Sequence, residues 1–175
     1  MIKTVLVATD GSNHADKACK LAIDVASKFR ARLVIVHTLL RDSNSATLRK
    51  LVKQSELTKE ERYLLKNYEI EFYTAMAGVE MGAINAPPPI ELLTPVGEQI
   101  VGRVAQAARK ARIAKVKSVV SGGDPADTIL KAAKTEKADL IVLGTRGFGE
   151  LKGLFLGSVS HKVAAHATCA VTTVK

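Results

Sequence analysis

The sequence predicts an α/β layered domain in which a parallel sheet is covered by helices. Short apolar, β-branched segments alternate with amphipathic segments of helical period from one end of the chain to the other. The apolar segments are continuous, as in strands that are buried on both faces. A length of 175 residues corresponds to about one domain. We therefore expect residues 1–175 to form a single domain.

The first unit is a strand, a helix and a second strand. Residues 4–8 form an apolar run that ends at the turn-forming triplet Asp10-Gly11-Ser12. Ser12 or Asn13 can cap the following helix, in which small apolar residues recur at helical spacing as far as Phe29. Residues 33–39 repeat the buried-strand pattern. Two strands joined through a helix are typical of a parallel sheet.

The region between residues 41 and 95 interrupts this alternation. Its first part looks helical and solvated, whereas its second part contains small residues and four closely spaced prolines. Helical spacing returns over residues 96–115. We expect a helical and proline-rich insertion at about 41–95, followed by a long helix whose basic outer face contacts solvent.

The rest of the chain repeats the scheme of the first unit. We expect, in order, a strand over residues 116–120, a helix over 126–137 that Asp124-Pro125 begins, a strand over 138–144, a glycine-rich loop over 144–157, a helix over 158–166 and a last strand over 169–175.

Composition excludes several classes of protein. Apolar residues make up 47% of the chain and charged residues 25%, which excludes disorder of the whole chain. Lys and Arg number 26 against 17 Asp and Glu, and the resulting charge of +9 favours anionic partners. Aromatic residues amount to only 4%, which leaves little material for stacking on bases. We therefore expect no nucleic-acid partner.

The cysteines and the apolar runs carry two further expectations. Cys19 and Cys169 lie far apart and form no CxxC motif, so we expect reduced core thiols and no zinc site. The apolar stretch near the start has five residues, too few for a signal peptide. No later run approaches the ~20 apolar residues that cross a bilayer. We expect a cytoplasmic protein without a membrane partner.

The stretch that carries chemistry is GTRGFGELKGLFLGSVSHKV, which begins at Gly144. Gly144 and Gly147 frame Thr145-Arg146 at the end of a buried strand, and Gly157-Ser158 opens a helix after a spacer of nine residues. Glycines let the backbone approach an anion closely, and a helix N-terminus presents unpaired N–H groups and a favourable dipole. Together with the Ser158 hydroxyl and the Arg146 charge, these parts predict phosphate recognition.

The loop after the first strand is expected to meet this glycine-rich loop. In an open α/β sheet the ligand binds beyond the carboxyl ends of the strands, and both loops follow such ends. Asp10 would repel a phosphate at close range, so we expect it to accept hydrogen bonds from ribose hydroxyls or to hold Mg²⁺ that bridges the phosphates. A plain turn or helix-start role for Asp10 is the alternative.

These motifs together resemble a known family. The pattern GxxG, nine residues, GS at residues 144–158, the opening VLVATDGSNHADKA and the end CAVTTVK resemble the universal stress proteins of the UspA family, in particular the nucleotide-binding branch. The resemblance covers about residues 1–40 and 96–175. It implies an open five-stranded parallel sheet of order 3-2-1-4-5 with helices on both faces, of the adenine nucleotide alpha hydrolase-like type. It also implies ATP or a related adenine nucleotide as ligand, and a homodimer paired through the last strand.

Carried over residue by residue, the family pattern assigns roles to positions of this chain. It places Asp10 near the ribose and a metal, the three motif glycines against the phosphates, and the ends of the first two strands beside the adenine. The nucleotide-binding residues implied in this way are Ala8, Thr9, Asp10, Val36, Thr38, Gly144, Thr145, Arg146, Gly147, Gly157, Ser158, Val159 and Ser160.

Three functions stay open on the sequence alone. The leading one is a stress-response module that binds ATP without catalysis. The second is a slow ATPase or autophosphorylating enzyme with Ser158 or Ser160 as acceptor. The third is a sensor of a different small ligand, in which the insertion covers the ATP site. The four histidines are dispersed, and the GxxxxGK[ST] and GxSxG strings are absent, so no catalytic residue is assigned.

Overall fold

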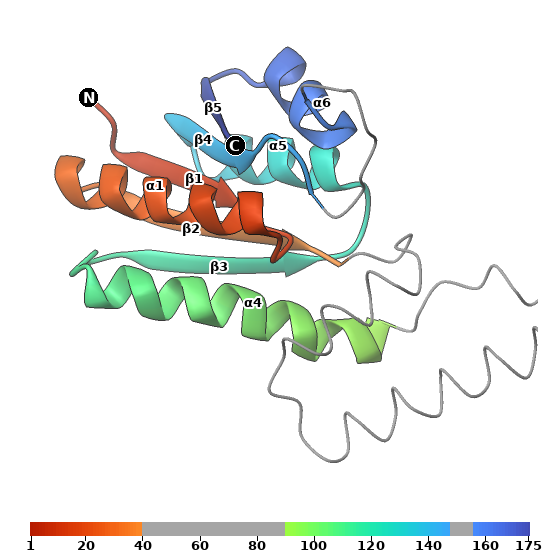
Figure 1. Cartoon of the computed structure of the whole chain (residues 1–175). Helices are drawn as coiled ribbons and strands as arrows, with labels where there is room; N and C mark the ends of the chain where they lie inside the picture. Colours follow the sequence, from red (N-terminus) through yellow and green to blue (C-terminus); the bar gives the residue numbers. More distant parts are fainter. Residues whose placement is uncertain (40–89, 148–155) are drawn as a thin grey trace, which may run out of the picture.

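A computed structural model describes residues 1–39, 90–147 and 156–175 (Figure 1). Most of the expected insertion, with part of the glycine-rich loop, lies outside these residues. The described elements are β1 (Thr4–Ala8), α1 (Asn13–Phe29), β2 (Arg32–Thr38), α4 (Ile90–Lys110), β3 (Val116–Ser121), α5 (Pro125–Thr135), β4 (Leu140–Gly144), α6 (Ser158–His166) and β5 (Ala170–Val174).

The five strands form one parallel sheet in the order β3-β2-β1-β4-β5, which confirms the predicted fold class. β1 is central, and it pairs with β2 on one side and with β4 on the other. The chain adds strands outward from β1 in one direction and then in the other. The carboxyl ends of β1 and β4 therefore flank the point where the strand order reverses, the usual ligand position in this class of sheet.

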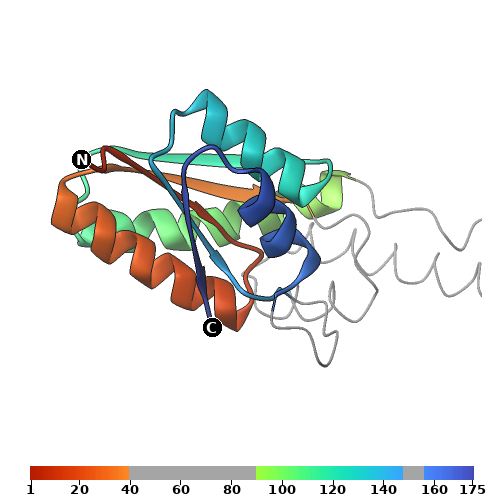
Figure 2. The same ribbon diagram turned by 90° about the horizontal axis from the view of Figure 1, so that it is seen from above.

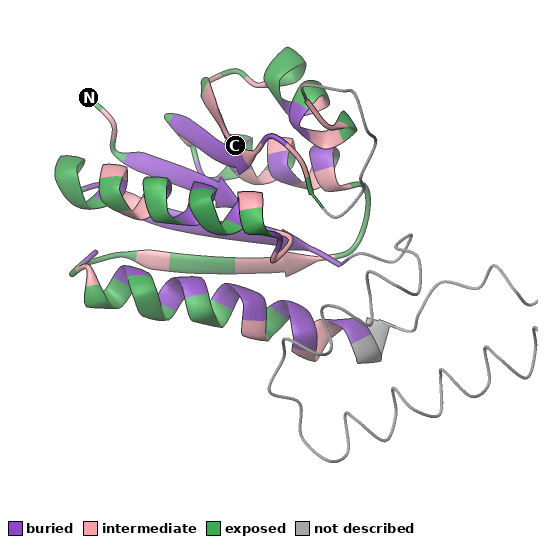
Figure 3. Ribbon diagram, in the orientation of Figure 1, coloured by how far each residue is buried: buried purple, intermediate pink, exposed green. Residues whose placement is uncertain are grey.

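Helices cover both faces of the sheet, with α1 and α4 on one face and α5 and α6 on the other (Figure 2). Side chains of β1 alternate between the two layers: Val5 and Val7 pack under α1, and Leu6 packs under α5 and α6. All three residues are fully buried, and Figure 3 colours the whole of β1 as buried. The central strands are thus apolar on both faces, because helices exclude water from each.

Side chains fix the starts of two helices as the sequence predicts. The Ser12 hydroxyl accepts a hydrogen bond from the Ala15 N–H at the start of α1, and the Asp124 carboxylate accepts one from the Asp127 N–H at the start of α5. These bonds satisfy N–H groups that have no partner within the helix.

Two helices end earlier than expected, because the backbone turns into the left-handed region at residues other than glycine. α4 ends at Lys110, where the sequence suggested residue 115, and α5 ends at Thr135, where it suggested 137. Arg112 and Lys137 then take φ values of 60° and 48°. A left-handed residue normally favours glycine or asparagine, so the sequence gives no sign of these ends.

Pro95 lies inside α4, although the sequence placed it in the proline-rich excursion. The helix begins at Ile90, and Leu93 is buried against Leu39 of the segment after β2. A proline in a helix removes one backbone hydrogen bond. Burial of Leu93 before Pro95, together with Val96 after it, stabilises the helix across this interruption.

Candidate functional site

The chain leaves β1 through a turn that Asp10 stabilises. The Thr9 N–H donates to the Val36 carbonyl at 2.9 Å, which continues the pairing of β1 with β2 by one residue. The Asp10 Oδ1 then accepts a hydrogen bond from the Ser12 N–H at 2.9 Å, and Gly11 between them has a φ of 83°. The Asp10 side chain is therefore held at the carboxyl end of the sheet while it stays partly exposed.

The loops after β1 and β4 meet, as the sequence predicts. Gly147 lies so close to Asp10 that a Cβ atom at position 147 would collide with the Asp10 Oδ2. A Cβ atom at Gly144 would lie 2.9 Å from the Cβ of His14 in the first turn of α1. The absence of side chains at Gly144 and Gly147 therefore permits the contact between these loops.

Thr145 connects this junction to α6 and to β5. Its N–H donates to the Val174 carbonyl at 2.8 Å, and its carbonyl accepts from the Gly157 N–H at 2.8 Å. The Ser160 Oγ lies 2.9 Å from the Thr145 carbonyl and 2.9 Å from the Gly157 carbonyl, to which its hydroxyl can donate. Ser160 is buried, so the start of α6 is fixed beside the end of β4.

Replacement of Ser160 by alanine is expected to lower the free energy of unfolding by about 1 kcal/mol, because it removes a buried side-chain hydrogen bond while both carbonyls keep their backbone donors. Chemical denaturation in urea measures the change. Ser158→Ala is the matched control, since Ser158 is exposed in the same helix turn, and it should change stability by less than about 0.5 kcal/mol. Equal effects of the two substitutions would contradict the role of Ser160 in holding the start of α6 beside the end of β4.

The start of α6 differs from the starts of α1 and α5. Those helices carry side-chain caps and an acidic residue in the first turn, namely Asp16 and Asp127. α6 begins after Gly157 with no side-chain cap and no acidic residue in its first turn. Because the first N–H groups of a helix lack partners within it, α6 presents donors and a positive dipole end beside the junction. This arrangement suits an anion.

The side of the site expected to hold adenine is more deeply buried. Val36 is only 1% exposed and lies in the core cluster with Ala8, while its carbonyl accepts from Thr9. Thr38, at the end of β2, is buried as well. Of the residues assigned to the adenine, Ala8 and Val36 thus have mainly core contacts in this conformation, whereas Thr9 adjoins Asp10 directly.

His37 supports the end of β1 from the neighbouring strand. Its Nδ1 lies 2.8 Å from the Thr9 carbonyl, so this nitrogen carries the proton and donates. Burial lowers the pKa of His37, and the hydrogen bond to Thr9 only partly opposes this shift. Gly97 of α4 allows the close packing, since a Cβ atom there would lie 2.8 Å from the His37 ring. His37 is thus a neutral, structural histidine.

Both cysteines are free thiols, but only Cys19 is a core residue as expected. Cys19 is buried under the sheet, and burial raises its pKa to about 12, which keeps it protonated and unreactive. Cys169 is partly buried, and burial raises its pKa too.

Metal binding at this site would depend on one carboxylate. Within residues 1–39, 90–147 and 156–175, no group of three or more His, Cys, Asp or Glu side chains is placed to hold a metal ion. Mg²⁺ bound to a nucleotide commonly uses only one or two carboxylates together with phosphate oxygens and water. Asp10 fits that requirement, because its carboxylate lies beside the Gly147 backbone.

His14 is the residue that sequence reasoning missed. It contacts Gly144 through its Cβ and backbone, and so helps to form the junction between α1 and β4. The strand order carries the signal: because β4 pairs directly with β1, the first turn of the helix after β1 must lie over the end of β4.

Comparisons with known proteins agree with this architecture. The family model described as the universal stress protein family matches residues 1–175. The "Universal stress protein in QAH/OAS sulfhydrylase 3'region" of Thermus aquaticus is 33% identical, with 100% of both chains covered. Universal stress protein UspA from Lactobacillus plantarum superposes with a TM-score of 0.69 at 20% identity, over 99% of this chain and 98% of that one. A universal stress protein solved in complex with cAMP gives a TM-score of 0.59 at 26% identity, over 99% and 97%.

Proposed function

The chain belongs to the universal stress protein family, and on that premise we propose that it is a cytoplasmic stress-response module that binds an adenine nucleotide, with ATP as the leading candidate. The nucleotide lies at the carboxyl ends of β1 and β4. The cAMP complex of a related protein supports an adenine nucleotide as the class of ligand.

The uncapped start of α6 carries this proposal. Ser158 and Val159 bring backbone N–H groups and a hydroxyl to a helix end without a capping side chain. Gly157 leaves this end open because it has no side chain, while its own N–H donates to the Thr145 carbonyl. A phosphate group there would accept hydrogen bonds from N–H groups that lack helical partners, and the helix dipole would favour its charge. Gly144 and Gly147, with Thr145-Arg146 between them, form the other wall of this phosphate site.

Asp10 lies beside the place proposed for the ribose or for a phosphate-bound metal ion. Its Oδ1 is engaged by Ser12, and its Oδ2 is directed toward Gly147, between the β1 end and the phosphate site. Mg²⁺, when bound with the nucleotide, would neutralise phosphate charge. Asp10 would then hold the ion or accept hydrogen bonds from the ribose hydroxyls.

A slow ATPase or autophosphorylating enzyme is the alternative, and the burial of Ser160 favours Ser158 as its phosphate acceptor. Ser160 is buried, with its hydroxyl at hydrogen-bond distance from two carbonyls, whereas Ser158 is exposed at the helix start. Ser158 is therefore the acceptor to test. A sensor of another small ligand, in which the insertion covers the ATP site, is the third candidate.

Isothermal titration calorimetry with ATP and with GTP tests the proposal. Micromolar binding of ATP in the presence of Mg²⁺, with much weaker binding of GTP, is the expected result. An absence of heat with ATP, AMP and cAMP would refute an adenine-nucleotide site. ADP release during the titration would instead favour the enzyme.

We further propose a homodimer paired through β5, which is an edge strand of the described sheet. The Val174 carbonyl is directed toward β4, where it accepts from Thr145. Backbone groups alternate in direction along a strand, so those of Val171 and Thr173 are directed away from β4 and can pair with a second copy.

Thr173→Pro is therefore expected to convert the dimer into a monomer, because proline removes an outward N–H group without removing a bond to β4. Sedimentation velocity distinguishes the two species. Thr173→Val retains the N–H group and should leave the dimer intact. A wild-type chain that sediments as a monomer of 18.7 kDa would contradict the pairing.

A further inference from the structure

The positive charge of the chain is concentrated at the end of the sheet opposite the proposed nucleotide site. We define the amino edge by three sets of described residues. They are the connection that directly precedes each strand, the last turn of each helix, and the first two residues of each strand. It contains two acidic residues, Glu136 and Asp139, and eleven cations: Lys3, Lys28, Arg30, Arg32, Arg109, Lys110, Arg112, Lys115, Lys117, Lys134 and Lys137.

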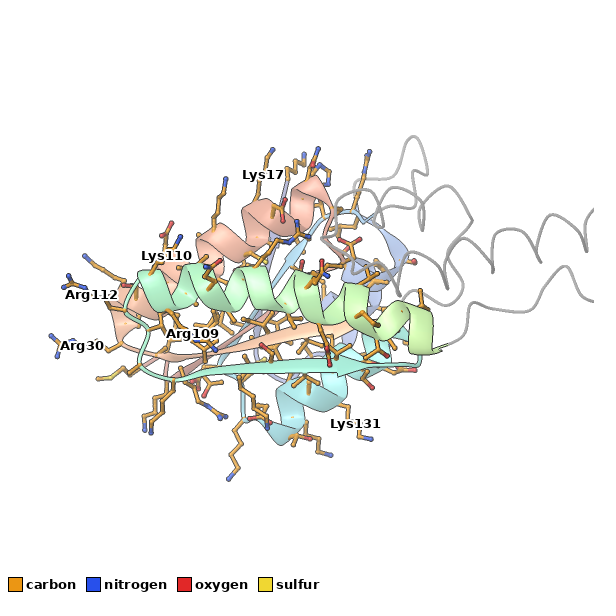
Figure 4. All side chains as sticks on the ribbon, turned by 90° about the horizontal axis from the view of Figure 1, so that it is seen from below. Lys17, Arg30, Arg109, Lys110, Arg112 and Lys131 are labelled. Atoms are coloured by element: carbon orange, nitrogen blue, oxygen red, sulfur yellow. The ribbon has the colours of Figure 1, made fainter. Side chains whose placement is uncertain are left out.

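The amino edge therefore accounts for the whole formal charge of +9. Elsewhere in the described chain seven cations balance seven acidic residues, and residues 40–89 also contain seven of each. Figure 4 shows Arg30, Arg109, Lys110 and Arg112 at one end of the molecule, with Lys17 and Lys131 away from it. In the described structure, Glu136 forms ion pairs with Arg32 and Lys117, at 3.0 and 2.7 Å.

Helix dipoles explain only some of these cations. Lys28, Arg109, Lys110 and Lys134 lie in the last turns of α1, α4 and α5, where positive charge stabilises a helix. Arg30, Arg112 and Lys137 lie beyond those turns, in the left-handed region, with φ values of 53°, 60° and 48°. Glycine would adopt this backbone at lower conformational cost.

All three left-handed positions outside glycine in the described structure are thus cations at the same edge. A stability requirement would favour glycine at these positions. A requirement for positive charge at the edge explains the residues that are present.

Apolar side chains lie at the same edge. Phe29, between Lys28 and Arg30, is 49% exposed, and Met1 before β1 is fully exposed. Contact with the phosphate groups of a nucleic-acid backbone buries little of an exposed aromatic ring. Insertion at the boundary between lipid headgroups and acyl chains does bury the ring, and basic residues there contact anionic headgroups.

We propose that the amino edge is a docking surface for an anionic lipid leaflet. The cations belong to several separate connections, so together they match an extended charged surface better than a compact anion. The expectation of no membrane partner came from the lack of a long apolar run, which concerns segments that cross a bilayer and carries no information about where surface charges lie. Docking at this edge leaves the carboxyl end of the sheet, with the proposed nucleotide site, directed away from the lipid.

Cosedimentation of the full chain with vesicles tests the proposal. The protein should bind vesicles of phosphatidylcholine and phosphatidylglycerol, bind weakly to phosphatidylcholine alone, and dissociate at high salt. The test variant combines Arg30→Gly, Arg112→Gly and Lys137→Gly, which should retain the fold because glycine suits these positions. The control combines Lys17→Gln, Lys20→Gln and Lys131→Gln, which remove the same charge from other surfaces.

The glycine variant is expected to lose about 100-fold in affinity for the anionic vesicles, since each cation at a leaflet contributes about fivefold. The control should lose less than about threefold, by weakened long-range attraction alone. Equal losses in the two variants would overturn the proposal, since net charge and not the amino edge would then govern binding. Failure of the wild-type chain to bind anionic vesicles would overturn it too.

Phe29→Trp supplies a second readout, because the chain contains no tryptophan. The fluorescence of this variant should shift to shorter wavelength on addition of anionic vesicles. Leu21→Trp, on α1 away from the edge, should not shift. Unshifted fluorescence of Phe29→Trp, with salt-sensitive binding of duplex RNA at lower concentrations than of vesicles, would assign the surface to nucleic acid and overturn the lipid proposal.

Discussion

Gly157→Val is expected to weaken ATP binding by at least about 100-fold, because the added side chain keeps phosphate away from the N–H groups at the start of α6. The fold is expected to stay intact. Gly157 has φ −72° and ψ 164°, a conformation open to any residue. A Cβ atom there would lie 3.4 Å from the Thr145 carbonyl and 3.8 Å from the Ser160 Oγ, which are ordinary contacts. The methyl groups beyond that Cβ would occupy the space in front of the first N–H groups of α6. Calorimetry measures the affinity, and thermal unfolding checks the fold.

Gly102→Val is the matched control for this substitution. A Cβ atom at Gly102 on α4 would meet no atom within 4 Å, so the same side chain is added at an open surface. Its affinity for ATP should equal that of the wild-type chain. Gly144 and Gly147 are less useful probes, since their Cβ atoms would collide with His14 and Asp10 and would disturb the protein itself. Undiminished ATP binding by a folded Gly157→Val protein would exclude the α6 start as the phosphate site.

Asp10→Asn is expected to abolish the effect of Mg²⁺ on ATP affinity. In the wild-type chain, Mg²⁺ should strengthen ATP binding by about tenfold or more relative to EDTA, because the Asp10 carboxylate supplies a charged oxygen ligand to the ion. Asparagine retains an oxygen that can accept from the Ser12 N–H, so the turn after β1 should persist. It lacks the negative charge that the ion requires. Titrations with and without Mg²⁺ measure the difference.

Asp24→Asn provides the control for the lost charge. Asp24 lies on α1, away from the junction, and its replacement changes net charge by the same amount. It should leave the effect of Mg²⁺ unchanged. If Asp10→Asn weakens ATP binding equally with and without Mg²⁺, Asp10 contacts the ribose, and a metal role for it is wrong.

Strands and capped helices were predictable because their signals are local. The run TVLVA gives the bounds of β1, and Ser12 and Asp124 cap helices where the sequence expects them. The ends of α4 at Lys110 and of α5 at Thr135 were not predictable, since the left-handed cations Arg112 and Lys137 that follow them carry no local signal. The position of Pro95 depended on a distant contact between Leu93 and Leu39, which only the assembled fold supplies.

For the candidate site, sequence supplied the motifs and the fold supplied their contacts. The meeting of the loops after β1 and β4 was predicted from the rule for parallel sheets, whereas the contact of His14 with Gly144 required the pairing of β1 with β4. The sequence suggested Ser160 as a nucleotide-binding residue or phosphate acceptor, but not its hydrogen bond to the Thr145 carbonyl, because that partner lies across a loop. The net charge of +9 could likewise be calculated from the sequence, but only the fold shows that the amino edge carries it.

Whether the start of α6 holds the phosphate of a bound nucleotide is tested by denaturing the freshly purified protein and identifying any released small molecule by chromatography and mass spectrometry. The wild-type chain and Gly102→Val are expected to release an adenine nucleotide, and Gly157→Val is expected to release none. Release of equal amounts from Gly157→Val, or of a ligand without phosphate, would contradict a phosphate site at the start of α6.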